Sequence, residues 1–167
     1  PSFVAGVFTD MPAEAYFAIE AMSQSGAKEM LRSPLHFRFQ RDNPTKPTPA
    51  MQFGTAVHTG ILEPEKFDAA VVAIPACDRR TKDGKATFAA FMATAVGKIA
   101  LPQADFDRCR RTIDAVHRHP AARRLLEGGE RELSLFWIDA KYRVPCKCRL
   151  DLRNFGGIVD VKTTQDA

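Results

Sequence analysis

The C-terminal stretch most constrains the fold of this chain, because two charges interrupt an apolar run rich in β-branched residues. Residues 157–164 have the sequence GIVDVKTT, and residues 158–161 have the composition of a buried strand. On a strand, Asp160 and Lys162 point to the same face because they are two residues apart. Buried charges are costly unless they are paired or bound to a metal. The pattern predicts a strand over residues 157–163 that carries a polar cluster.

A second acid, Asp151, follows the strand predicted over residues 142–150 and is separated from Asp160 by eight residues. Two carboxylates can hold a hard divalent cation through their oxygens. A neighbouring lysine can orient a water or stabilise negative charge on a phosphate. The alternative is an Asp–Lys ion pair at a sheet edge, because isolated Asp-x-Lys triplets are common.

The pattern of Asp151 followed by Asp160-Val161-Lys162 resembles the signature of PD-(D/E)XK nucleases. The wider runs CKCRLD and IVDVKTT look like the RecE (exonuclease VIII) branch, of the RecB and lambda-exonuclease type. The resemblance implies an α/β fold with a central mixed β-sheet flanked by helices. It also implies that Asp151 and Asp160 bind Mg²⁺ together with the Val161 carbonyl, while Lys162 positions the attacking water or stabilises the transition state. Mn²⁺ is a plausible substitute, because both metals suit carboxylate oxygens.

Residues 51–63 predict a helix that contains His58, and a lone histidine in a helix is most often a core or surface residue. However, GTAVH followed by LEPEKF resembles the G-x-x-x-H motif of RecB and RecE nucleases. That resemblance implies that His58 is a metal ligand or organises the active site. Glu63 is then a candidate for a supporting acid, with a solvated helix surface as the alternative.

Residues 130–138 predict a strand whose even-numbered residues, starting with Glu132, share one face. The ordinary explanation for Glu132 is solvent exposure. The run GGERELSLFW resembles the segment that bears the first acid of the nuclease family, which implies that Glu132 binds a second metal directly or through water. A hairpin through a turn at residues 139–141 would bring Glu132 near Asp151. A register shift of one residue would favour Glu130 instead.

Two stretches predict contacts with DNA. The segment MSQSGAKEMLRSPLHFRF, a helix capped by Ser23 or Ser25 and then interleaved aromatic and basic residues, resembles the RecE region near the DNA path. The loop RRTKDGK also looks like RecE sequence, and its cations suit phosphates. The alternatives are inward-packed Phe37 and Phe39 with solvated arginines, and a solvated loop. The predicted DNA-binding residues are Ser23, Ser25, Lys28, Arg38, Arg79, Arg80, Lys82 and Lys85.

Composition fits one domain of 167 residues, with a helical lead-in over residues 1–50 and a nuclease core over 51–167. The sequence has no apolar run of about 18 residues and no signal peptide, so a cytoplasmic protein without a membrane span is expected. Its four cysteines lack Cys-x-x-Cys spacing, which disfavours a zinc or iron–sulfur site. The net charge of +4 is compatible with nucleic acid but does not require it.

The family resemblance implies a 5′→3′ exonuclease that acts on linear double-stranded DNA ends and leaves 3′ overhangs for recombination. It also implies a homo-oligomeric ring, with a single-strand annealing recombinase as a candidate partner. RecE-like chains continue past the position of Ala167, so we expect this chain to be truncated at its C-terminus. The alternatives are another PD-(D/E)XK endonuclease or repair nuclease, and a non-catalytic DNA-binding module of the same fold.

Overall fold

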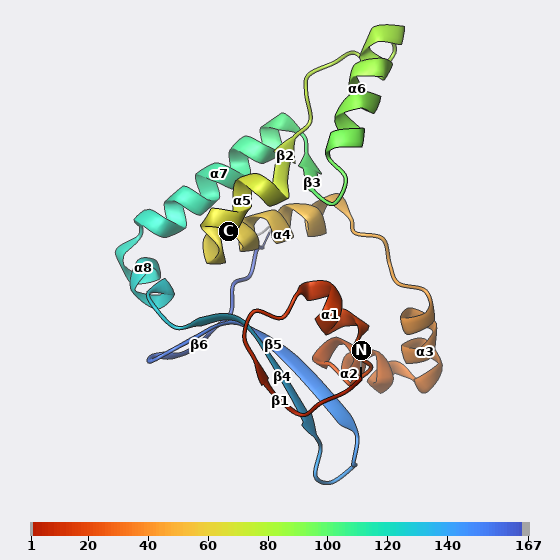
Figure 1. Cartoon of the computed structure of the whole chain (residues 1–167), viewed down its shortest axis with the longest axis vertical. Helices are drawn as coiled ribbons and strands as arrows, with labels where there is room; N and C mark the ends of the chain where they lie inside the picture. The colour runs from red at the N-terminus through yellow and green to blue at the C-terminus, as the bar shows by residue number, and fades with distance from the viewer. Residues whose placement is uncertain (1, 165–167) are drawn as a thin grey trace. The chain divides into compact units, whose positions relative to one another are not determined.

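The computed structural model describes residues 2–164, and the chain divides into two compact units (Figure 1). Unit 1 comprises Pro1–Lys46 and Glu127–Asp160. Unit 2 comprises Pro47–Leu126 and Val161–Ala167. The chain therefore enters unit 2 after its first three helices and returns to unit 1 for the long hairpin.

Unit 1 is built on a four-stranded antiparallel sheet of order β1-β4-β5-β6. Its elements are β1 (Gly6–Phe8), α1 (Ala13–Ala18), α2 (Gln24–Arg32), α3 (Pro34–Asp42), β4 (Glu130–Ile138), β5 (Pro145–Asn154) and β6 (Gly157–Val159). One face of the sheet carries an aromatic core. In it, Phe136 of β4 makes edge contacts with Phe3 and Phe8 and lies 5.7 Å, centroid to centroid, from Tyr16 of α1. This core fixes α1 against the same face that carries the even-numbered residues of β4.

Unit 2 contains helices and a short parallel pair of strands. Its elements are α4 (Pro49–Leu62), α5 (Pro64–Ala70), β2 (Val71–Ala73), α6 (Lys82–Thr94), β3 (Ile99–Leu101), α7 (Gln103–Arg118) and α8 (Pro120–Leu126). α4 buries one continuous face, which includes Ala56, Val57 and Ile61. A Cβ placed on Gly60 would come within 2.1 Å of the Ile113 side chain, so a glycine lets α4 and α7 approach closely.

The sheet differs from the sequence-based expectation of one central mixed sheet. In residues 2–164, the antiparallel strands and the parallel pair form two separate sheets. The chain is nevertheless α/β, with a sheet accompanied by helices. None of the helices in this range is long and apolar enough to cross a membrane.

Three predicted boundaries are wrong, and one helix was not predicted. The third strand ends at Val159 rather than at residue 163, because its pairing with β5 ends at the Leu152–Val159 pair. β5 starts at Pro145 and runs to Asn154, so Asp151 lies within the strand rather than after it. Residues 34–42 form helix α3, started by the Ser33 side chain, which accepts a hydrogen bond from the His36 N–H at 3.1 Å. Lys82 and Lys85 lie in the first turns of α6 rather than in a loop.

Candidate metal centre

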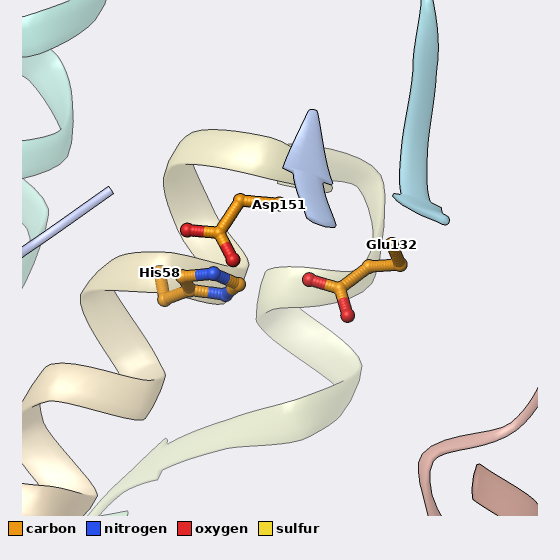
Figure 2. Close-up of side chains that lie close together, drawn as sticks. All are labelled: His58, Glu132 and Asp151. Atoms are coloured by element: carbon orange, nitrogen blue, oxygen red, sulfur yellow. The ribbon is translucent and has the colours of Figure 1, made fainter. Parts of the chain in front are cut away.

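The β4–β5 hairpin places two carboxylates opposite each other. The pairs Arg131–Leu152 and Leu133–Leu150 flank Glu132 and Asp151, so the register sets these two acids directly across from one another. Both side chains are half-buried, and ligand oxygens of the two lie within 4.8 Å of each other (Figure 2). Like charges this close repel each other, and a divalent cation bound by both would offset that repulsion. The expected proximity of Glu132 and Asp151 is confirmed.

The backbone at Glu132 is unusual for the middle of a strand. Its φ is 52°, which lies in the left-handed region that favours glycine. Holding a non-glycine residue there costs about 1–3 kcal/mol, and such residues cluster at active sites and ligand-binding positions. The strain falls on the one position of β4 that faces Asp151.

Arg149 contacts Glu132 from the neighbouring strand. The Arg149 Nε lies 2.6 Å from the Glu132 Oε2, and the two side chains are only 17% and 20% exposed. The Arg149 Nη2 also donates a hydrogen bond to the Met11 carbonyl at 2.9 Å, and its guanidinium lies 5.6 Å from the centre of the Tyr16 ring. The sequence analysis did not identify this residue, since its partner becomes clear only once the strands are paired.

Lys147, two residues before Arg149, lies on the same face of β5 and is 8% exposed. Its Nζ donates hydrogen bonds to the carbonyls of Tyr16 at 2.9 Å and Ile19 at 2.7 Å, at the C-terminal end of α1. A cation there satisfies the last carbonyls of a helix. Burial lowers the pKa of Lys147 and raises the pKa of the Tyr16 hydroxyl. Sequence analysis also missed this lysine, whose role is to attach α1 to the sheet.

The predicted Asp-x-Lys motif lies just beyond the last strand of unit 1. Asp160 and Lys162 are exposed and Val161 is half-buried, and all three follow the end of β6. The β5–β6 register, continued by one residue, would set Asp160 opposite Asp151. The catalytic and metal-binding roles of these three residues remain predictions.

His58 belongs to α4 of unit 2 and is half-buried. It lies one turn after Gly54, so the two share a face of the helix. A Cβ on Gly54 would lie 3.0 Å from the Thr163 Oγ1, which explains the glycine of the G-x-x-x-H motif as a point of close approach. His58 is thus on the side of α4 that meets the segment just after Lys162. Glu63, at the end of α4, forms an ion pair with Lys66, which favours its surface role.

The residues predicted to bind DNA lie in both units. In unit 1, the Ser23 Oγ accepts a hydrogen bond from the Gly26 N–H at 3.2 Å and caps α2, whereas Ser25, Lys28 and Arg38 are exposed. The Arg38 Nε lies 3.7 Å from an Asp42 oxygen. Ser23 therefore has a structural role that accounts for it without DNA. For the other three, DNA contact remains a prediction.

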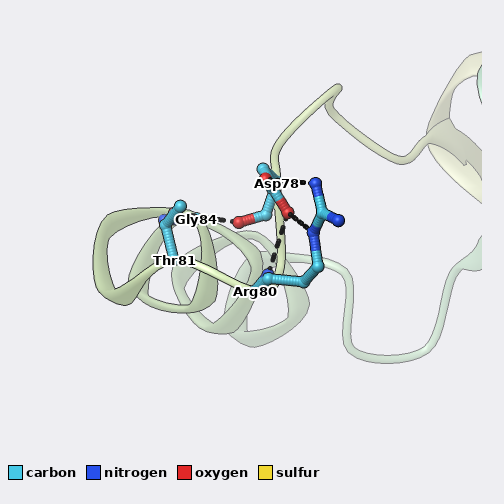
Figure 3. Close-up of polar contacts among 4 residues, drawn as sticks. All are labelled: Asp78, Arg80, Thr81 and Gly84. Carbon is cyan, nitrogen blue, oxygen red and sulfur yellow. Dashed lines mark hydrogen bonds and ion pairs between the residues drawn. The ribbon is translucent and has the colours of Figure 1, made fainter.

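In unit 2, the four basic residues predicted to bind DNA lie just before α6 or in its first turns, and Figure 3 shows one of them, Arg80, beside Asp78. Arg80 holds Asp78 through two side-chain hydrogen bonds and one backbone hydrogen bond, each 3.0 Å long. These bonds lower the pKa of Asp78. The Arg79 guanidinium lies 4.8 Å from the centre of the Phe88 ring, whereas Lys82 and Lys85 are exposed. Arg80 therefore already has an acidic partner in the protein.

The cysteines show no metal site. All four are free thiols, and no cysteine in residues 2–164 belongs to a group with metal-binding geometry. Burial raises the pKa of the Cys109 thiol to about 11, which keeps it protonated.

The paired acids and the α/β architecture define a PD-(D/E)XK-like domain, the class whose nucleases generally depend on divalent metals. The chain belongs to the family of PDDEXK-like domains of unknown function (DUF3799), whose profile matches residues 23–167. The matched range contains Glu132, Asp151, Asp160, Lys162 and His58. The predicted superfamily is confirmed, whereas the RecE-like branch is not tested. No curated protein matches the chain.

Proposed function

We propose that this protein is a metal-dependent deoxyribonuclease. The observation that supports this most directly is the pair of half-buried acids, Glu132 and Asp151, which face each other across two strands in a chain of PDDEXK-like sequence. Within that class, we propose a 5′→3′ exonuclease that acts on linear double-stranded DNA and leaves 3′ overhangs. That finer assignment rests on the RecE-like runs around Asp151 and Asp160.

The proposed metal ligands are Glu132 and Asp151 of unit 1, whose carboxylates lie close together (Figure 2). The RecE-like resemblance adds His58, Asp160 and the Val161 carbonyl. A set dominated by carboxylate and carbonyl oxygens suits Mg²⁺ and Mn²⁺. The metal would lower the pKa of a bound water and neutralise charge on the scissile phosphate.

The other proposed roles fall to side chains of this chain. Lys162 would orient the attacking water or donate to the developing negative charge. Lys28 and Arg38 of unit 1, and Arg79, Lys82 and Lys85 of unit 2, would contact the phosphate backbone without reading sequence. The RecE-like interpretation also implies an assembly and a partner: a ring of several copies around the DNA, and a single-strand annealing recombinase.

The test is digestion of linear duplex labelled at its 5′ ends, run beside closed circular DNA, with Mg²⁺ or with EDTA. We expect release of label from the linear duplex only, dependent on metal and lost in Asp151→Asn and Asp160→Asn. The control is Asp114→Asn, which removes a carboxyl on the exposed surface of α7 and should cleave as the wild type does.

Cleavage of the circle would replace the exonuclease with an endonuclease. DNA binding without cleavage, with either Mg²⁺ or Mn²⁺, would replace the enzyme with a DNA-binding module. Full activity in Asp151→Asn would contradict the proposed metal centre.

A further inference from the structure

We infer that Arg149 is a positioning residue for Glu132: it fixes the carboxylate so that one oxygen remains directed at the metal position shared with Asp151. The inference rests on the proposed metal-dependent function. It adds a residue that lies outside the expected ligand set.

The Arg149 guanidinium is itself held in place. Its Nη2 donates to the Met11 carbonyl just before α1, and its Cζ lies 5.6 Å from the centre of the Tyr16 ring. Tyr16 is in turn fixed by Phe136 and by Lys147, whose Nζ lies 4.7 Å from the centre of the Tyr16 ring. Glu132 therefore meets a cation that is anchored to the core of unit 1 rather than a mobile surface side chain.

The polar atoms around Arg149 indicate that its interaction with Glu132 is electrostatic. In residues 2–164, three buried side-chain atoms make no hydrogen bond: the Ser134 Oγ and the Arg149 Nε and Nη1. Ser134 and Arg149 are directly paired across β4 and β5, one position along the same face from Glu132 and Asp151. The Nε is close to Glu132 Oε2 without hydrogen-bond geometry, so charge attraction is what compensates for its burial.

The position of Glu132 accounts for the need for this cation. Asp151 presents a like charge directly opposite Glu132. Figure 2 shows one Glu132 oxygen directed toward Asp151 and the other directed away. A fixed cation beside the Oε2 atom holds the acid near Asp151, where the metal is proposed to bind. Residues that orient metal ligands in this way typically contribute 10–100-fold to metal affinity or activity.

The same hairpin provides a matched control in Arg153 and Glu130. They are also an Arg–Glu pair on β5 and β4, but their closest atoms are 3.8 Å apart and their side chains are 60% and 49% exposed. Loss of Arg153 removes the same charge from the same strand without disturbing a buried acid.

The test measures Mn²⁺ binding in the absence of DNA, by the electron paramagnetic resonance signal of free Mn²⁺, for wild type, Arg149→Met, Arg149→Lys and Arg153→Met. We expect Arg149→Met to weaken Mn²⁺ binding about 10-fold or more. Arg149→Lys should recover part of this loss, because an ammonium keeps the charge but not the planar fork. Arg153→Met should bind as the wild type does. Cleavage assays should show the same order as a rise in the Mn²⁺ concentration needed for half-maximal rate.

Two results would overturn the inference. One is wild-type Mn²⁺ binding by a folded Arg149→Met. The other is equal loss of binding in the Met and Lys variants together with a large fall in melting temperature, which would show that Arg149 only supports the fold. A wild-type protein that binds no Mn²⁺ would instead refute the metal centre of the proposed function, so the two failures are distinguishable.

Discussion

Two arginine–glutamate pairs join the same two strands, and they differ in almost everything except residue type. Arg149 and Glu132 are 2.6 Å apart at their closest atoms and mostly buried, whereas Arg153 and Glu130 are 3.8 Å apart and exposed. Glu130 has an ordinary strand backbone, and Glu132 has a positive φ. The difference shows that the surroundings of a charge, rather than its identity or spacing, mark the functional candidate on this hairpin.

The physical reason is the medium around each pair. Exposed ion pairs contribute about 0–1 kcal/mol, because water and salt screen them. A mostly buried pair is screened less by solvent. Loss of one partner therefore leaves the other charge buried and uncompensated. The two pairs should therefore respond very differently to the same substitution.

The largest expected difference is between Glu132→Gln and Glu130→Gln. Each removes one negative charge and keeps the side-chain shape, but only Glu132 faces Asp151. We expect Glu132→Gln to weaken Mn²⁺ binding about 10–100-fold and to reduce cleavage accordingly, whereas Glu130→Gln leaves both unchanged. Isothermal titration with Mn²⁺ measures the effect, and equal losses in the two variants would show that the hairpin acids are not distinguished by burial.

The next effect concerns stability. Lys147 lies on the same face as Arg149, and its replacement in Lys147→Met leaves the Tyr16 and Ile19 carbonyls without their donor. We expect a loss of about 1–3 kcal/mol in the free energy of unfolding, the usual penalty for stranding buried hydrogen-bonding groups. Lys141→Met is the exposed control and should change little. Urea denaturation of both proteins provides the comparison, and similar midpoints would mean that Lys147 does not attach α1.

A smaller effect on cleavage is expected from substitution of Gly54. This substitution tests the segment that contains the Asp-x-Lys motif rather than the β4–β5 hairpin. A methyl group there would come within 3.0 Å of the Thr163 Oγ1 and would push on the segment that follows Lys162. Alanine is the better helix former by up to about 1 kcal/mol. We therefore expect Gly54→Ala to preserve or raise the melting temperature while it lowers cleavage several-fold. Thr55→Ala, on the exposed side of α4, is the control, and unchanged cleavage in Gly54→Ala would refute the contact's role.

The smallest effect is expected at a third, fully exposed pair, Asp78 and Arg80. Hydrogen bonds from Arg80 lower the pKa of Asp78 below its usual value of 3.8. A lowered folded-state pKa stabilises the fold above pH 3.8, and this contribution disappears as the pH falls through the folded-state pKa. Arg80→Gln should return the Asp78 pKa toward 3.8 without a measurable change in melting temperature. A carboxyl titration by nuclear magnetic resonance tests this, and an unchanged pKa would contradict the paired geometry.

Much of the local structure follows from sequence because local signals were strong. Residues 132–135 alternate polar and apolar side chains, apolar residues follow them, and residues 130–138 form β4 over the predicted range. Ser23 precedes a good helix-forming run and caps α2 as one of two predicted caps. The strands β1 and β3 were missed because three residues carry too little periodicity to recognise.

The errors arise where tertiary contacts, rather than local sequence, determine the secondary structure or the role of a residue. The alternating aromatic and basic residues in 35–41 show no helical period, yet Ser33 and Pro34 start a helix there. In that helix Phe37 lies near Gly26, whereas Phe39 is 61% exposed. The Glu132–Asp151 pair could be anticipated, since a hairpin register links positions across two strands. Arg149 could not, because its role depends on the burial that α1 provides. Lys147 was missed for the same reason.

The left-handed backbone at Glu132 has an evolutionary consequence. Glycine would adopt this conformation without steric penalty and asparagine with little, so folding stability alone would favour either over glutamate. Selection for thermal stability alone, in the laboratory or in nature, should therefore favour Gly or Asn at position 132, and the acid would be lost. Persistence of an acid at this position among related chains would record selection for chemistry acting against selection for stability.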